Sequence, residues 1–173
     1  MILDILSYIA RFIFIVLIQV LVINNLEITT YINPYIYIVI ILSLPFNTKP
    51  WVVLVISLLA GTIMDSFSNS PGLHMAACVF MGYFRRFYLL FSTNKEDQSS
   101  NNHPSISSKG WVWFITYALI LTFLHHFVLF FLEAYSIFEF TDTVFRIFFS
   151  SIFSVLIITI GQLLFYKVSK KSY

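Results

Sequence analysis

Long, continuous runs of apolar residues, separated by short polar breaks, divide this chain of 173 residues. A helix needs about 20 consecutive apolar residues to cross a bilayer, so six such runs use most of the chain. Because the runs do not alternate with period two, they favour helices over the strands of a barrel. The sequence therefore predicts an all-α polytopic membrane protein, with a single transmembrane domain over residues 1–173. Its six expected transmembrane helices cover residues 5–23, 34–46, 51–67, 73–90, 111–132 and 143–166.

Composition disfavours the main alternative classes. Only 10% of the residues are charged and 59% are hydrophobic, whereas a soluble globular domain carries about 25% charged residues. The sequence matches no catalytic triad, phosphate-binding loop, CxxC pair or zinc-binding motif. We therefore expect no enzymatic activity, no cofactor, no metal and no nucleic-acid partner, with the lipid bilayer as the surroundings.

The basic residues indicate an orientation, because Lys and Arg are retained on the cytoplasmic side of bacterial inner membranes. With the N-terminus inside, nine of the ten Lys and Arg residues fall on the cytoplasmic side. Only Arg146 falls outside, where Glu139 and Asp142 could pair with it. The sequence thus predicts a multi-pass protein with both termini in the cytoplasm. The basic residues on that side are Arg11, Lys49, Arg85, Arg86, Lys95, Lys109, Lys167, Lys170 and Lys171.

The second apolar segment is shorter than the others. As a helix, residues 34–46 would reach only about 20 Å, less than the roughly 30 Å of a hydrocarbon core. Asn33 and Pro34 suit the first positions of a helix. The segment is therefore interpreted as a helix that either re-enters or crosses fully, and Lys49 beyond its end favours a full crossing.

The stretch from residue 92 to residue 109 is rich in Ser, Asn and charged residues. Such a segment buries too little apolar surface to offset the entropy of ordering it. We predict a disordered cytoplasmic loop, with docking to a partner as the alternative.

Polar residues inside a bilayer are costly, so they are candidates for function. Gly61 and Asp65 share one helix face, where the glycine allows close approach of another helix and the acid presents an acceptor. Asp65 either caps the next helix or has a partner-facing or fold-locking role. On the expected topology, the polar residues of the outer half are Asn24, Asn25, Asp65, His74, His125, His126 and Glu133.

The histidines and glutamines of these segments favour hydrogen bonding within the protein. His74 is expected to accept from Ser70 or to pair with Asp65. His125 and His126 are adjacent, so their side chains point about 100° apart and hardly share a metal. We expect one of them to face neighbouring helices and the other the outer interface. Gln19 and Gln162 are expected to bond between helices or to backbone.

One motif resembles a known family. The stretch Gly-Thr-Ile-Met-Asp at 61–65 is followed by Ser-Phe-Ser-Asn-Ser-Pro-Gly-Leu-His at 66–74. Together they resemble the most recognisable motif of the MreD family, the bacterial rod shape-determining membrane proteins. Residues 19–24, 33–37, 44–46 and 82–86 are similar to that family as well, so the resemblance covers about the first 90 residues. The residues that it singles out are Gly61, Asp65, Pro71, Gly72 and His74.

The resemblance implies a six-helix inner-membrane protein whose fold is similar to the substrate-binding subunits of energy-coupling-factor transporters. It implies a non-catalytic scaffold in the elongation complex that builds sidewall peptidoglycan and sets cell shape. The usual partner in that family is MreC, a single-span periplasmic protein, and the complex extends to MreB, RodA and a penicillin-binding transpeptidase.

The alternative is a small-molecule-binding membrane subunit of a transporter. It would enclose its ligand with Asp65, His74 and either His125 or His126. Such subunits dock through faces of small residues, and the chain has only five glycines, which favours the scaffold.

Single cysteines at Ser99, Ser169 and Ser68, each in a Cys78→Ser background, test the predicted orientation. In intact cells, Ser99→Cys and Ser169→Cys should be shielded from a membrane-impermeant thiol reagent, whereas Ser68→Cys should react, because the basic residues place the first two inside. Labelling of Ser99→Cys before the cells are lysed would overturn the six-span topology.

Overall fold

The computed structural model describes residues 2–26, 31–134 and 140–164, with side chains from residue 9 onwards. These residues are mostly helical and form no β-strand, so the all-α prediction is confirmed. The long helices are α1 (Ile2–Leu21), α3 (Pro50–Ser68), α4 (Leu73–Ser92), α7 (Trp111–Glu133) and α8 (Phe140–Leu164). The short ones are η1 (Ile23–Asn25), α2 (Val39–Leu42), α5 (Lys95–Ser99) and α6 (Ile106–Lys109).

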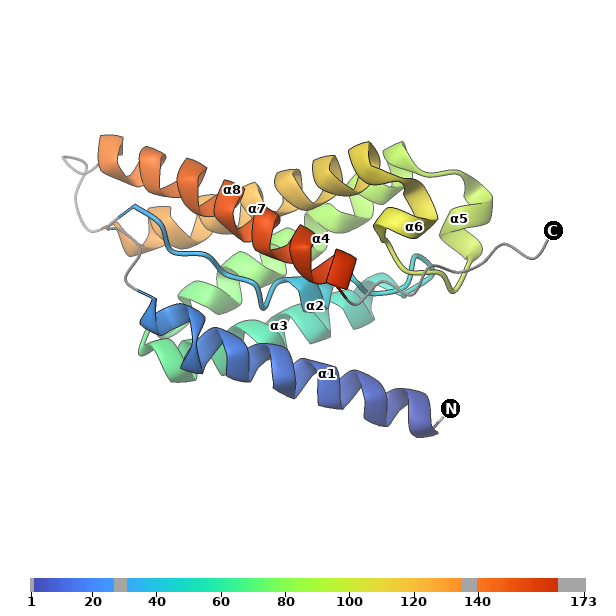
Figure 1. Cartoon of the computed structure of the whole chain (residues 1–173), viewed down its shortest axis with the longest axis horizontal. Helices are drawn as coiled ribbons and strands as arrows, with labels where there is room; N and C mark the ends of the chain where they lie inside the picture. The colour runs from blue at the N-terminus through green and yellow to red at the C-terminus, as the bar shows by residue number, and fades with distance from the viewer. Residues whose placement is uncertain (1, 27–30, 135–139, 165–173) are drawn as a thin grey trace.

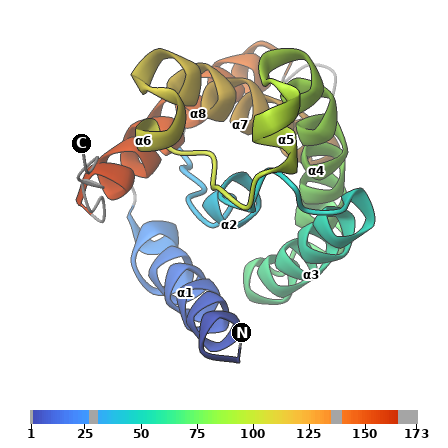
Figure 2. The same ribbon diagram turned by 90° about the vertical axis from the view of Figure 1, so that its right-hand side faces the viewer.

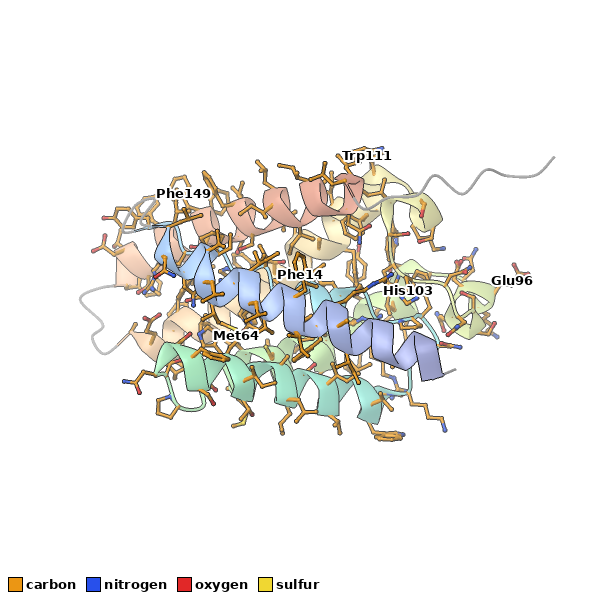
Figure 3. The ribbon with its side chains drawn as sticks, turned by 60° about the horizontal axis from the view of Figure 1, so that its bottom comes forward. Phe14, Met64, Glu96, His103, Trp111 and Phe149 are labelled. Carbon is orange, nitrogen blue, oxygen red and sulfur yellow. The ribbon has the colours of Figure 1, made fainter. Side chains whose placement is uncertain are left out.

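The five long helices stand around one central stretch of chain. Seen nearly along the helices, α1, α3, α4, α7 and α8 surround α2 (Figure 2). Helix α3 packs against α4, α4 against α7, and α7 against α8. Three of them, α3, α7 and α8, are long and apolar enough to cross a membrane, which indicates a helical membrane protein. Large apolar side chains such as Phe14 and Phe149 are exposed on the outside, as lipid contact requires (Figure 3).

The two ends of the helical ring differ. One end, the loop end, carries α5, α6, the start of α1 and the last turn of α8 (Figure 1). The other, the turn end, carries the connection between α3 and α4. Lys49, Lys95 and Lys109 belong to elements at the loop end. The basic tail at Lys167, Lys170 and Lys171 and the acid Glu139 lie outside the described residues.

The expected helix over residues 34–46 is corrected by the structure. Only Val39–Leu42 is helical in this region, and neither Asn33 nor Pro34 begins a helix. Residues 31–46, here called the central segment, run from the turn end, beside α8, to the loop end, where Phe46 N donates to Asn102 O at 3.0 Å. The reason is reach, because an extended chain advances about 3.3 Å per residue and a helix only about 1.5 Å.

Helix α1 supplies bonding partners for the first half of the central segment. Non-helical backbone at membrane depth is tolerated only where its polar groups find partners inside the protein. Gln19 is fully buried. Its Oε1 accepts from the backbone N–H of Ile36 at 2.6 Å and of Tyr37 at 3.4 Å, and its Nε2 donates to Pro34 O at 3.1 Å. One side chain thus satisfies three backbone groups.

Helix α8 supports the same half from another side. Ser150 Oγ accepts from Asn33 N at 2.9 Å and donates to Tyr31 O at 3.2 Å. Ser154 Oγ accepts from Tyr35 N at 2.9 Å. The two serines are four residues apart, so they lie on one face of the helix, and that face is polar because the central segment passes along it.

At the loop end, Arg85 and Tyr117 hold the second half of the central segment. Tyr117 OH donates to Leu42 O at 2.8 Å, and Arg85 Nε donates to Tyr117 OH at 2.9 Å. Arg85 Nη2 also donates to Leu44 O and, at 3.4 Å, to Pro45 O. Only 2% of Arg85 is exposed, so its guanidinium makes these bonds inside the protein.

Residues 92–109 also differ from the prediction of a disordered loop. They form α5 and α6, and they bond to the residues that follow α2. His103 Nδ1 lies 2.6 Å from Ser43 O, and Asn47 N donates to Ser100 O at 3.3 Å. The loop is ordered by these bonds to the 43–47 backbone and by the buried Ile106, and composition alone does not reveal such bonds.

Replacing Gln19 by leucine tests the role of the central segment. Gln19→Leu keeps the apolar bulk but leaves the N–H of Ile36, the N–H of Tyr37 and the carbonyl of Pro34 without this partner. We expect a loss of about 1–3 kcal/mol in the free energy of unfolding, measured by thermal unfolding of the detergent-purified protein. The matched control is Gln162→Leu in α8, which should change stability little. Equal stability of the two variants would contradict this role of Gln19.

Candidate functional site

The residues that the sequence singled out lie in the turn between α3 and α4. Helix α3 ends at Ser68, and Asn69 follows in the left-handed region with φ 52°. Gly72 has φ 87° and precedes the first residue of α4. Positive φ is unfavourable for most residues, so glycine and asparagine suit these two positions. Pro71 lies exposed between them.

Asp65 caps the start of α4 with its carboxylate. Oδ1 accepts from His74 N at 2.9 Å and from Ser70 Oγ at 3.2 Å. Oδ2 accepts from Gly72 N and from Met75 N, both at 3.0 Å. The first N–H groups of a helix lack partners within the helix and form its positive end, so a carboxylate there is stabilising. The sequence predicts either a helix cap or a partner-facing or fold-locking role for Asp65. The structure shows that Asp65 caps α4, and this cap joins α3 to α4.

Gly61 allows the two helices to meet at their backbones. A Cβ atom at Gly61 would lie 2.4 Å from Met75 Cα and 2.6 Å from His74 O. Further along the same interface, a Cβ atom at Gly82 would lie 2.3 Å from Ser57 Oγ. Because Cα and carbonyl atoms cannot turn away as a side chain can, Gly61 has no room for any side chain.

Tyr37 of the central segment joins the site to α7. Its hydroxyl lies 3.0 Å from His74 Nδ1, 2.8 Å from His125 Nε2 and 3.3 Å from Cys78 Sγ. These four residues, the Tyr37 cluster, are at most 2% exposed. The His74 ring was expected to bond to Ser70 or Asp65, but it bonds to Tyr37, while its backbone N–H bonds to Asp65. Sequence reasoning missed Tyr37, because a tyrosine in an apolar run reads as ordinary packing.

His125 and His126 are both fully buried, which corrects the expectation that one faces the outer interface. His126 Nδ1 lies 2.8 Å from Thr122 O, and its Nε2 lies 3.3 Å from Ser154 Oγ. Helix α7 lies between α4 and α8 and beside the central segment (Figure 2). His125 and His126 are adjacent on α7, and both side chains therefore contact other parts of the protein.

Charged groups near the turn end pair differently from the expectation. Arg146 Nη1 lies 3.1 Å from Glu133 Oε2, and its guanidinium lies over the ring of Phe130 at 4.3 Å. Asp142 instead accepts a hydrogen bond from Tyr31 OH at 3.1 Å.

The described residues hold no group of three His, Cys, Asp or Glu that could bind a metal ion. The connection at residues 69–72 and the Asp65 carboxylate that bonds to it are here called the Asp65 turn. His74 links this turn to the Tyr37 cluster. These bonds hold α3, α4, α7 and the central segment in one geometry, so the role that they support is a structural one.

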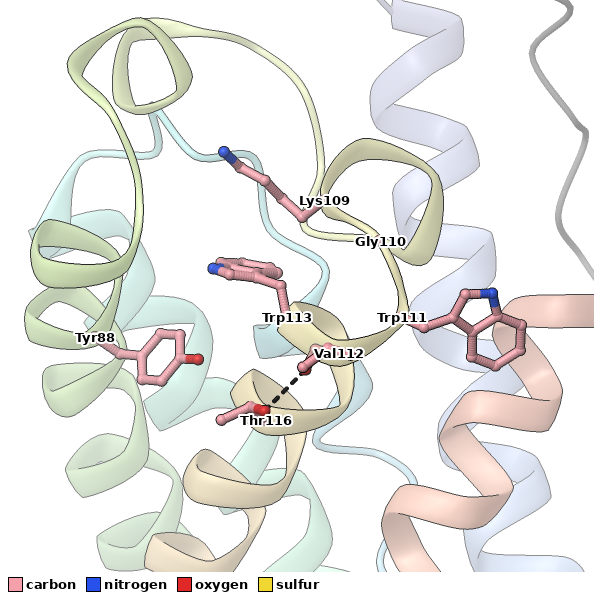
Figure 4. Close-up of a pocket in the computed structure, with 7 residues that line it drawn as sticks. All are labelled: Tyr88, Lys109, Gly110, Trp111, Val112, Trp113 and Thr116. Carbon is pink, nitrogen blue, oxygen red and sulfur yellow. Dashed lines mark hydrogen bonds between the residues drawn. The ribbon is translucent and has the colours of Figure 1, made fainter.

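An open hollow of about 560 Å³ lies at the loop end, lined by the first turns of α7, by Lys109 and Gly110 before them and by Tyr88 of α4 (Figure 4). Trp113 points into the space between these helices, below Lys109, whereas Trp111 points to the other side. Trp113 Nε1 donates to Ser92 O at 3.1 Å, and its ring stacks on Tyr117 with centroids 5.0 Å apart. Tryptophan and tyrosine favour the membrane–water interface, where one part of the ring is apolar and another polar.

Comparison with known proteins finds no match for this chain among protein-family models, curated proteins or solved structures. The geometry of the Asp65 turn and of the Tyr37 cluster, together with the motif at residues 61–74, is therefore what supports a function.

Substitution of Gly61 by alanine tests the close contact of α3 and α4. Gly61→Ala places a methyl group against the backbone of Met75 and His74, so the helices must separate. We expect destabilisation by about 1–3 kcal/mol, measured by thermal unfolding in detergent. The control is Gly161→Ala, because a Cβ atom at Gly161 in α8 meets nothing within 4 Å. A Gly61→Ala protein as stable as the control would show that the contact is not required.

Proposed function

We propose that this protein is a non-catalytic membrane scaffold of the MreD type in the bacterial inner membrane. It binds MreC laterally and helps to organise sidewall peptidoglycan synthesis and cell shape. Its wider setting is the elongation complex with RodA, a penicillin-binding transpeptidase and MreB. The proposal is supported by the resemblance of residues 61–74 to the MreD motif and by the single hydrogen-bonded turn that these residues form.

The burial and the hydrogen bonds of Asp65 and His74 are the observations that support the proposal most. Both are at least 93% buried. The Asp65 carboxylate holds the start of α4, and the His74 ring contacts Tyr37. A motif that fixes two membrane helices against each other suits a protein that must hold a defined surface for a partner helix.

The transporter alternative requires the same polar residues to be free for a ligand. His74 and His125 instead share the hydroxyl of Tyr37. The ring of Tyr35 also lies among them, with its centroid 5.0 Å from that of His74 and 5.6 Å from that of His126. Space that a substrate would need is thus occupied by an aromatic ring, which favours the scaffold.

The proposed topology has six crossings and places both termini and the loop end in the cytoplasm. Five crossings are the long helices, and the sixth is the central segment. Support comes from Lys49, Lys95 and Lys109 at the loop end and from the start of α1 and the last turn of α8 beside them (Figure 1). Basic residues are enriched on the cytoplasmic side. A fold similar to the substrate-binding subunits of energy-coupling-factor transporters belongs to this proposal, since the MreD resemblance implies it.

Recovery of MreC with the tagged protein tests the proposed function. We expect MreC, identified by mass spectrometry, to co-purify in mild detergent from the native bacterium. Asp65→Asn turns one acceptor of backbone N–H groups into a donor and loosens the turn. It should lower MreC recovery at least about fivefold and round the cells at an equal amount of protein in the membrane.

The matched control is Asp142→Asn, the same change at an exposed acid near the turn end, which should leave recovery and shape normal. Rod-shaped cells and full MreC recovery with Asp65→Asn would contradict the scaffold. Loss of small-molecule uptake in rod-shaped cells would favour the transporter subunit instead.

A further inference from the structure

A second cavity at the loop end, of about 260 Å³, lies between the start of α3, the last turns of α4 and Gln98 of α5. Three of its lining side chains, Lys49, Arg85 and Arg86, are cations. None of the residues that line it is acidic. The cavity is thus a concentration of positive charge at one end of a bundle of membrane helices.

The structure provides no counter-charge for these cations among the described residues. The ion pairs found there join Lys109 to Asp97 and Arg146 to Glu133, and neither involves a cation of the cavity. Arg85 is 98% buried, and its guanidinium donates to two backbone carbonyls and a tyrosine hydroxyl, all neutral. A buried charge without an opposite charge is unfavourable, so an anion in the cavity would stabilise Arg85.

The backbone adds to the same potential. Helix α3 begins at the cavity with Pro50, and no side chain caps its first N–H groups. The start of a helix carries partial positive charge. This contribution reinforces the three cations, which remain the main attraction for an anion.

The walls of the cavity identify the kind of anion. Beside the cations lie the apolar side chains of Val53, Leu89 and Leu90, and Leu90 is 48% exposed on the outside of α4. A soluble anion gains nothing from such a wall, whereas a lipid places its phosphate by the cations and its chains along the apolar surface. We propose that the cavity binds the phosphate of an anionic phospholipid. Its assignment to the cytoplasmic leaflet rests on the proposed topology, but the binding itself does not.

Two exposed cations allow a test that leaves the fold intact. Arg85 stays unchanged, because it holds the central segment. Lys49→Gln and Arg86→Gln remove the other two charges, and Lys95→Gln is the control, an exposed lysine of α5 that does not line the cavity. Delipidated full-length protein in detergent is titrated with phosphatidylglycerol or phosphatidylcholine, and native mass spectrometry counts the lipid bound.

We expect phosphatidylglycerol to bind more tightly than phosphatidylcholine. Each cation removed should weaken its binding about fivefold, so the double variant should bind about 25-fold less tightly. Lys95→Gln should bind like the unaltered protein. Equal binding of both lipids, or an unchanged affinity in the double variant, would overturn the proposal. Displacement of phosphatidylglycerol by inorganic phosphate at equal concentration would assign the cavity to a soluble anion and overturn it as well.

Discussion

The backbone polar groups of the central segment are the constraint on which the rest of the structure depends. A helix satisfies its own N–H and C=O groups, but a non-helical segment inside a membrane protein must find partners in its neighbours. Gln19 of α1 provides them on one side and Ser150 and Ser154 of α8 on another, while Tyr117 and Arg85 hold the second half. Four of the five surrounding helices thus contribute a side chain to one strip of backbone, which sets their positions around it.

The motif at the α3–α4 turn is connected to this strip. Asp65 fixes the first N–H groups of α4, and this cap positions His74 in the first turn of α4. The His74 ring meets Tyr37 of the central segment, whose hydroxyl also meets His125 of α7. The backbone contact at Gly61 keeps α3 close enough for the cap to form. These contacts connect the turn to the centre of the protein, so a change at the turn is expected to disturb the packing around Tyr37.

Much of this arrangement was predictable from the sequence, and the exceptions have physical reasons. The apolar runs gave 51–67 and 111–132, close to α3 and α7, because a continuous run of that length in a bilayer favours a helix. The Gly61 and Asp65 spacing indicated a close contact and an acceptor at a helix end. The sequence predicts a helix at 34–46 because hydropathy cannot distinguish a buried non-helical chain from a helix. The polar residues that bond to this segment lie on other helices: Gln19 in α1, and Ser150 and Ser154, one turn apart, in α8. The order of residues 92–109 depends on backbone bonds to residues 43–47, which leave no mark on composition.

Whether the central segment is non-helical in a lipid bilayer shows most directly if it depends on Gln19, Ser150 and Ser154 for its backbone partners. Solid-state NMR of isotopically labelled protein in liposomes gives the Cα and Cβ chemical shifts of residues 33–46, which distinguish helical from extended backbone. The hydrogen bonds to Gln19, Ser150 and Ser154 predict helical shifts for Val39–Leu42 and non-helical shifts for Pro34–Ile36. A continuous series of helical shifts from Pro34 to Phe46 would contradict this prediction, because a helix would satisfy its own backbone and leave Gln19, Ser150 and Ser154 without their role.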